Sequence, residues 1–202
     1  SVSLMQSAVV YDRAIVESQI IYLPITLRYY PNTIYLVNGD FSAGLTAWTV
    51  LGSLGVSSAT DRSSPYGPVA LLGDPHYPCA GGVPIATGGI RQTFTVPAAP
   101  TGVSAHLRFR YRIVTNDKNA NLLDVWDSFD VYVGSERKFR DANRTLFNYC
   151  NVPPYDLGWK NADILLGPGG TALTFTFEVA NRGDNYYNTY VYVDDIRIAY
   201  VQ

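Results

Sequence analysis

The sequence is poor in charge. Charged residues make up 16% of the chain, against about 25% in an average soluble domain, and the formal net charge is −2. A chain with this balance lacks the basic surface that holds nucleic acid or anionic lipid, so we expect neither as a partner. No run approaches the roughly 20 apolar residues of a membrane-spanning helix, and we therefore expect no membrane span.

Residues that build catalytic and metal centres are also scarce. The chain has two histidines, His76 and His106, and no G-x-S-x-G, H-E-x-x-H, C-x-x-C or glycine-rich phosphate loop. Asp124, Asp127 and Asp130 form the one local carboxylate cluster, which suits a polar strand-edge loop better than the acid pair of a glycosidase. We expect a protein that is not an enzyme.

Cysteine occurs only twice, as Cys79 and Cys150, each in proline-rich loop sequence. The two thiols are either unrelated or joined in a disulfide, and the extracellular character of the composition favours the disulfide. Closing this loop would stabilise the fold by roughly 4 kcal/mol in the chain-entropy model. The start, Ser1-Val2-Ser3, lacks the basic segment of a signal peptide, so a secreted chain has already lost its signal. We expect an extracellular or cell-surface location.

The abundant residues favour strands and turns. Apolar residues make up 47%, and the chain has 16 tyrosines, 17 glycines and 12 prolines. The clearest periodicity is two, as in 105–114, where large apolar residues alternate with Arg108, Arg110 and Arg112. This arginine stripe suits a solvated outer face opposed by acidic neighbours such as Glu178 better than a site for an anionic polymer.

Short alternating segments recur between turn clusters along the chain, which is typical of antiparallel sheets. The sequence predicts an all-β fold, a two-sheet antiparallel jelly-roll sandwich without amphipathic helices. Residues 134–159 interrupt the spacing and are predicted to form a long loop. The predicted strands cover residues 69–72, 90–96, 105–114, 128–133, 160–166, 171–180 and 190–200.

Two motifs frame the part of the chain from residue 37 onward. The opening motif is Asn38-Gly39-Asp40-Phe41-Ser42, followed by Leu45-Thr46-Ala47-Trp48, and the closing motif is Tyr192-Val193-Asp194-Asp195-Ile196-Arg197-Ile198. Their order and spacing resemble jelly-roll carbohydrate-binding modules and related galactose-binding-like domains. The resemblance covers residues 37 to 202 and implies the fold more strongly than it implies sugar binding.

The resemblance also implies a structural calcium between the two motifs. The ligands would be Asp194, with help from Asn38 and Asp40. Period two places Asp194 on the same inward side as Ile196 and Ile198, where a carboxylate needs a metal or hydrogen-bond donors. Ser42 stands where the family usually supplies a glutamate, so hydrogen bonds from strand-end amides remain the alternative.

Sugar recognition in such modules depends on exposed aromatic rings that stack against pyranose C–H surfaces. The candidates are Trp126, Tyr155, Trp159 and Tyr187. The alternative is that these rings pack in the core or cover loops.

Residues 1–33 precede the module, which we place at 34–202. Their last part alternates, with Ile21, Leu23, Ile25, Leu27 and Tyr29 on one face of a predicted strand. This extension either folds along its own sandwich or adds to the sheet of a neighbouring copy, as in donor-strand complementation. The second arrangement does not close, so it predicts a self-assembling homopolymer or filament. The alternative function is a module that recognises polysaccharide.

Overall fold

The computed structural model describes residues 9–16, 19–26, 33–60, 67–77, 81–117, 127–142, 154–182 and 187–202, the first two ranges as main chain only. The chain divides into two compact units, Ser1–Pro31 and Asn32–Gln202. In the described ranges no helix is long and apolar enough to cross a membrane. Cys79, Cys150, Trp126, Leu27 and Tyr29 lie outside these ranges, and the disulfide stays a prediction.

The first unit contains an antiparallel hairpin of β1 (Val9–Val16) and β2 (Gln19–Thr26). The register pairs Val16 with Gln19 and Val9 with Thr26. Ile21, Leu23 and Ile25 therefore occupy alternate positions on one face of β2, as the sequence pattern predicts.

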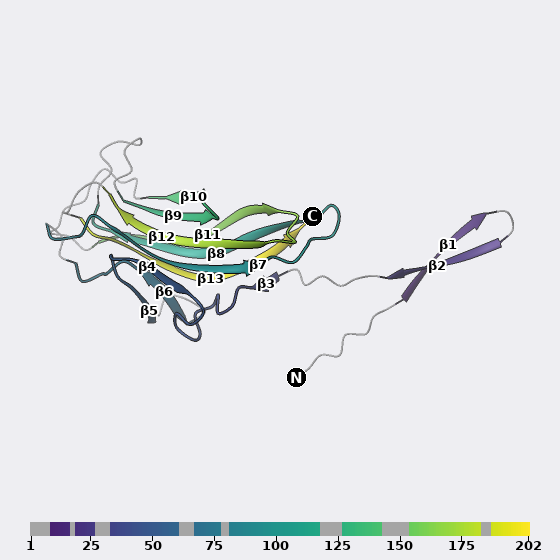
Figure 1. The fold of residues 1–202 in the computed structure, drawn as a ribbon, viewed down its shortest axis with the longest axis horizontal. Coiled ribbons are helices and arrows are strands. Elements are labelled where there is room, and N and C mark those ends of the chain that lie inside the picture. Colours follow the sequence, from purple (N-terminus) through teal and green to yellow (C-terminus); the bar gives the residue numbers. More distant parts are fainter. Residues whose placement is uncertain are drawn as a thin grey trace. The chain divides into compact units, whose positions relative to one another are not determined.

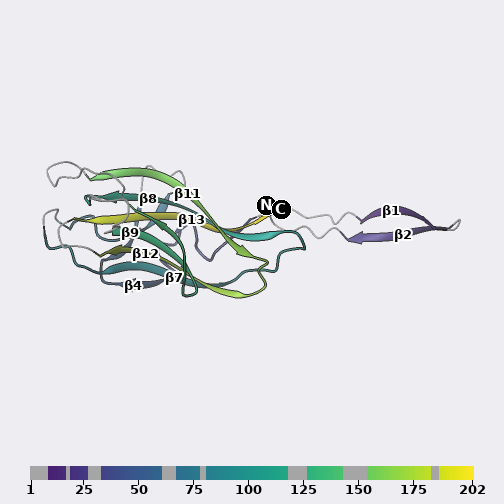
Figure 2. The same ribbon diagram turned by 90° about the horizontal axis from the view of Figure 1, so that it is seen from above.

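The second unit is a sandwich of two antiparallel sheets, drawn as two layers in Figures 1 and 2. The five-stranded sheet runs in the order β10 (Glu136–Asp141), β9 (Asp127–Val133), β12 (Ala172–Asn181), β7 (Thr87–Thr95) and β4 (Thr49–Gly52). The other sheet contains β11 (Tyr155–Gly167), β8 (Ser104–Thr115), β13 (Thr189–Val201), β6 (Pro68–Leu72) and β5 (Val56–Thr60), and β3 (Thr33–Tyr35) pairs with β13.

The core fills the space between the inward faces of the two sheets. Along β8 the buried side chains alternate with half-buried ones, which confirms the period-two prediction. Phe109 lies at the centre of an aromatic group, with its ring centroid 5.1 Å from Phe177 and 5.6 Å from Phe139. The predicted all-β jelly-roll sandwich is confirmed, and each predicted strand lies within an observed one or overlaps it.

The predicted long loop at 134–159 is wrong in part. Residues Glu136–Asp141 form β10, and β11 already begins at Tyr155. Strand β10 is an edge strand that turns Phe139 toward the aromatic core. Its other residues are charged, so it shows no apolar alternation of the kind used to find strands.

Candidate functional site

The loop between β3 and β4, residues 36–48, is tied to β13 by main-chain hydrogen bonds; we call it the Asn38 loop. The Leu36 N–H donates to the Ile196 carbonyl at 3.3 Å, and the Ile196 N–H donates to the Gly39 carbonyl at 2.9 Å. The close approach of the loop to β13 requires glycine at position 39, because a Cβ there would lie 2.2 Å from the Ile196 oxygen. Phe41 and Trp48 anchor the loop in the core with their buried rings.

The Asn38 side chain holds the loop in shape. Its Nδ2 donates to the carbonyls of Gly44 at 2.8 Å and Thr46 at 3.0 Å, and its Oδ1 accepts from the Ala43 N–H at 3.0 Å. Asn38 has a φ of 54°, in the left-handed region that asparagine tolerates better than most residues. The amide of Asn38 thus closes the loop through three hydrogen bonds.

A β-bulge brings two aspartates of β13 to this loop. Between Asp194, opposite Arg110, and Arg197, opposite Arg108, β13 has two residues where β8 has one. Asp195 has a φ of 56° and is held by an ion pair with Arg197. The prediction that Asp194 shares the inward side of Ile196 is wrong: the bulge reverses the alternation, and Asp194 lies on the outer face under the Asn38 loop.

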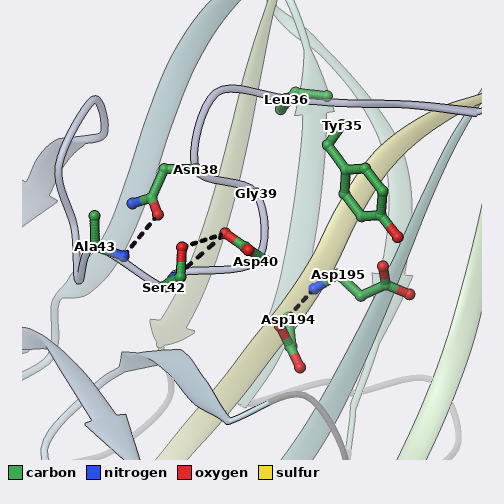
Figure 3. Close-up of a pocket in the computed structure, with 9 residues that line it drawn as sticks. All are labelled: Tyr35, Leu36, Asn38, Gly39, Asp40, Ser42, Ala43, Asp194 and Asp195. Carbon is green, nitrogen blue, oxygen red and sulfur yellow. Dashed lines mark hydrogen bonds between the residues drawn. The ribbon is translucent and has the colours of Figure 1, made fainter. Parts of the chain in front are cut away.

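The Asn38 loop and the bulge enclose a pocket of about 610 Å³, which we call the Tyr35 pocket (Figure 3). The Tyr35 side chain is 55% exposed, and Asp40 and Ser42 are also exposed. Asp40 Oδ1 accepts hydrogen bonds from the Ser42 N–H and Oγ, while Asp194 is fully buried and accepts from the Asp195 N–H at 2.7 Å. The lining consists of Tyr35, Leu36, Asn38, Gly39, Asp40, Ser42, Ala43, Asp194 and Asp195.

The three predicted calcium ligands, Asn38, Asp40 and Asp194, all line this pocket. Each of them already uses a side-chain oxygen in the local hydrogen bonds given above, and Asp40 is exposed whereas Asp194 is buried. Among the described residues, no three His, Cys, Asp or Glu side chains are arranged to hold a metal ion. The predicted set contains two aspartates and one asparagine, so any further ligands would be main-chain oxygens, and calcium binding stays a prediction.

Three residues of the predicted aromatic platform lie within the described ranges, on β11 and just before β13. Tyr155 begins β11 and is 48% exposed. Trp159 lies opposite Arg112, and the Arg110 guanidinium lies 5.0 Å from the centroid of its ring. Tyr187 is half-buried just before β13. One face of Trp159 is therefore covered, and Tyr155 is the most exposed ring of these three.

Two arginines of the β8 stripe are paired with aspartates of β11. Arg112 forms two hydrogen bonds with Asp156, at 2.9 and 2.6 Å, and Arg108 donates to Asp163 at 2.7 Å. The hydrogen bonds from Arg112 hold the pKa of the Asp156 carboxyl below its usual value. The acidic neighbours of the stripe are thus Asp156 and Asp163, and not Glu178, which lies in the other sheet.

Sequence reasoning missed two residues of the pocket, Tyr35 and Asp195. Tyr35 reaches it because β3 pairs with β13 and sets Tyr35 opposite Arg197. Two features of the sequence could have indicated these residues. One is the Thr-Ile-Tyr segment shortly before the opening motif, and the other is the pair of adjacent aspartates that breaks a period-two pattern.

No protein-family model matches the chain, and no curated protein matches its sequence. Among solved structures, the K3 cleaved adhesin domain of Lys-gingipain from Porphyromonas gingivalis superposes with a TM-score of 0.55 at 13% identity, over 82% of this chain and 99% of that domain. TmCBM61 in complex with β-1,4-galactotriose gives a TM-score of 0.48 at 13% identity, over 83% and 97%. A family 16 carbohydrate-binding module gives 0.39 at 15%, over 84% and 100%. The likeness is one of fold: the chain is a jelly-roll β-sandwich of the architecture that the two motifs predict.

Proposed function

We propose that this chain is a non-catalytic, extracellular module that binds neutral carbohydrate in the Tyr35 pocket. The observation that carries the proposal is that the exposed Tyr35 lines a pocket of about 610 Å³ together with the polar groups of Asp40 and Ser42. Rings of this kind stack on the C–H faces of sugars, and carboxylate and hydroxyl oxygens accept hydrogen bonds from sugar hydroxyls. Carboxylates at the pocket disfavour an anionic sugar, so the ligand is neutral.

The test is affinity electrophoresis of the full chain through neutral polysaccharides such as galactan, mannan and xylan. We expect Tyr35→Ala to weaken binding to the retaining polysaccharide by about tenfold, because the stacking surface is lost. Tyr155→Ala is the matched control, since Tyr155 is 48% exposed, against 55% for Tyr35, and belongs to the predicted platform of Trp126, Tyr155, Trp159 and Tyr187. Retention by no neutral polysaccharide, or a loss with Tyr155→Ala and none with Tyr35→Ala, would overturn this assignment.

The N-terminal hairpin supports a second candidate function, self-assembly into a homopolymer. Its two strands form a compact unit of their own, and two-stranded hairpins are marginally stable in water. A further strand supplied by a neighbouring copy would stabilise it. The two open edges differ, because Pro24 of β2 has no N–H, whereas β1 contains no proline. We therefore expect β1 to be the strand that pairs, in place of the alternating stretch from Ile21 to Tyr29 that the sequence pattern predicts as the assembly strand.

The module offers one long edge for such pairing. Among its described edge strands, β4 and β5 are short and β10 is mostly charged, while β11 runs for 13 residues with Leu165 60% exposed near its end.

Deletion of residues 1–31 tests the assembly. We expect a folded monomer by light scattering, and filaments or higher oligomers of the full chain by electron microscopy. Leu23→Asp in the full chain should have the same effect, because it places a second carboxylate opposite Asp12, on the face that holds Ile21 and Ile25. A full chain that stays monomeric at every concentration, or a truncated chain that still polymerises, would contradict this function.

A further inference from the structure

The outer face of the five-stranded sheet carries a row of side chains that crosses every strand. Arg137 of β10 lies opposite Tyr132 of β9, which lies opposite Thr176 of β12. Thr176 lies opposite Arg91 of β7, and Arg91 opposite Thr49 of β4. Directly paired residues of antiparallel strands share a face, and the flanking Val131, Phe175 and Phe177 are buried in the core. We call this outward set the Arg91–Arg137 row.

The neighbouring row holds its charges in mutual contacts. Arg140 donates to the two oxygens of Asp130 at 2.6 and 2.9 Å, and Arg182 donates to Asp130 at 2.8 Å. Arg182 also lies 3.7 Å from Glu178. These contacts satisfy the carboxylate of Asp130, which is fully buried.

The Arg91–Arg137 row is left with positive charge. Arg137 is 45% exposed and reaches only to 4.0 Å from Asp130, a carboxylate already bound by two other arginines. Arg91 is exposed, and within the described residues it forms no salt bridge. Glu136, which precedes Arg137 in β10, forms its ion pair with Lys138. Among the described residues, Asp130 is thus bound by Arg140 and Arg182 rather than by Arg137, whereas Arg108 and Arg112 of the β8 stripe are each paired with an aspartate.

We propose that the Arg91–Arg137 row binds an anionic polysaccharide, one that carries sulfate or carboxylate groups. Neighbouring strands lie about 4.8 Å apart, so the three spacings between β10 and β7 set the two arginines on the order of 14 Å apart. Between them lie a tyrosine and a threonine, which suit an uncharged, hydroxylated stretch of ligand. Guanidinium groups bind sulfate and carboxylate through paired hydrogen bonds.

A nucleic acid fits this row less well. Its backbone presents one charge per 3.4 Å of each strand, far denser than two arginines on the order of 14 Å apart. The net charge of −2 also gives no general attraction for a polyanion. This site is independent of the Tyr35 pocket, which lies on the other sheet and repels anionic sugars.

Retention of the full chain on dextran sulfate and on polygalacturonate, at low and rising salt, tests the proposal. We expect Arg91→Gln and Arg137→Gln each to weaken binding about tenfold, and the double variant about a hundredfold, because each removes charge-assisted hydrogen bonds. Arg108→Gln is the matched control, since Arg108 is paired with Asp163 on the other sheet. It should bind as the unchanged protein does, and thermal unfolding checks that each variant is folded.

Three results would overturn the proposal. They are no retention of the unchanged protein on either polymer, a double variant that binds as tightly as the unchanged protein, or retention on duplex DNA as strong as on dextran sulfate. Tyr35→Ala separates this site from the proposed function: it should lose neutral polysaccharide and keep dextran sulfate. The double arginine variant should do the reverse.

Discussion

Replacing Asp130 with alanine is expected to lower the free energy of unfolding by about 3–5 kcal/mol at neutral pH, the usual cost of breaking a buried ion pair. Asp130 is fully buried, and its two oxygens accept hydrogen bonds from Arg140, Arg182 and Ser128. Alanine leaves two guanidinium groups close together without the carboxylate between them. Urea denaturation of the variant and of the unchanged protein measures the difference.

Asp163→Ala is the matched control for this prediction. It also removes an aspartate that binds an arginine across two strands, but its side chain is 43% exposed. Solvent screens such a pair, so we expect a loss below about 1 kcal/mol. Equal losses for the two variants would show that burial of Asp130 does not set the strength of its contacts.

The pH dependence of stability provides a second readout of Asp130. Burial raises the pKa of the Asp130 carboxyl, but hydrogen bonds from Arg140 and Ser128 and the charges of Arg140 and Arg182 lower it further, so the net pKa lies below its usual value. The stabilisation is therefore present above the unfolded-state pKa of about 4 and is lost as the pH falls through the lower folded-state value. As the pH falls below about 4, Asp130→Asn should lose less stability than the unchanged protein does.

The strands and the sandwich were predictable because a half-buried strand repeats its apolar residues with period two. In β8 and in residues 174–179 of β12 the buried and half-buried positions alternate as the residue types do. Strand β10 was missed because an edge strand with a single large apolar residue, Phe139, carries no such repeat.

The candidate site was only half predictable. The opening and closing motifs bring Asn38, Asp40 and Asp194 into one pocket, as the resemblance implies. The orientation of Asp194 depends on one extra residue in β13, and period-two reasoning cannot see a bulge. Nor can it tell that the amide of Asn38 closes a loop rather than facing a ligand.

The distribution of charge on the surface is the feature that the local sequence predicts least well. Arg108, Arg110 and Arg112 look like a basic stripe, yet Asp156 and Asp163 come to Arg112 and Arg108 from a strand about fifty residues further along. Arg91 and Arg137 stand alone in the sequence and share a face only through the register of four strands. Arg91 and Arg137 therefore come onto one face through strand pairing, which the local sequence does not show.

Replacing Phe109 with alanine is expected to cost about 3–5 kcal/mol, as for large aromatic residues removed from protein cores. Its ring is buried and contacts the rings of Tyr111, Phe129, Phe139 and Phe177, with centroids 5.1 to 6.1 Å away. Phe177 and Phe139 belong to the opposite sheet, so Phe109 links the two layers of the sandwich. Its loss removes cross-sheet contacts and leaves a cavity that a tightly packed interior cannot close.

Urea denaturation of three variants separates this role from general hydrophobic loss. Phe109→Leu keeps most of the volume and should cost less than Phe109→Ala, because the cavity is smaller. Leu165→Ala removes an apolar side chain that is 60% exposed and should change stability by no more than about 0.5 kcal/mol. If Phe109→Ala unfolds at the same urea concentration as Leu165→Ala, the two sheets are not held together through this ring. If the urea midpoint of Phe109→Ala shifts several times more than that of Leu165→Ala, Phe109 links the two sheets. One of these sheets carries the Tyr35 pocket on its outer face, and the other carries the Arg91–Arg137 row.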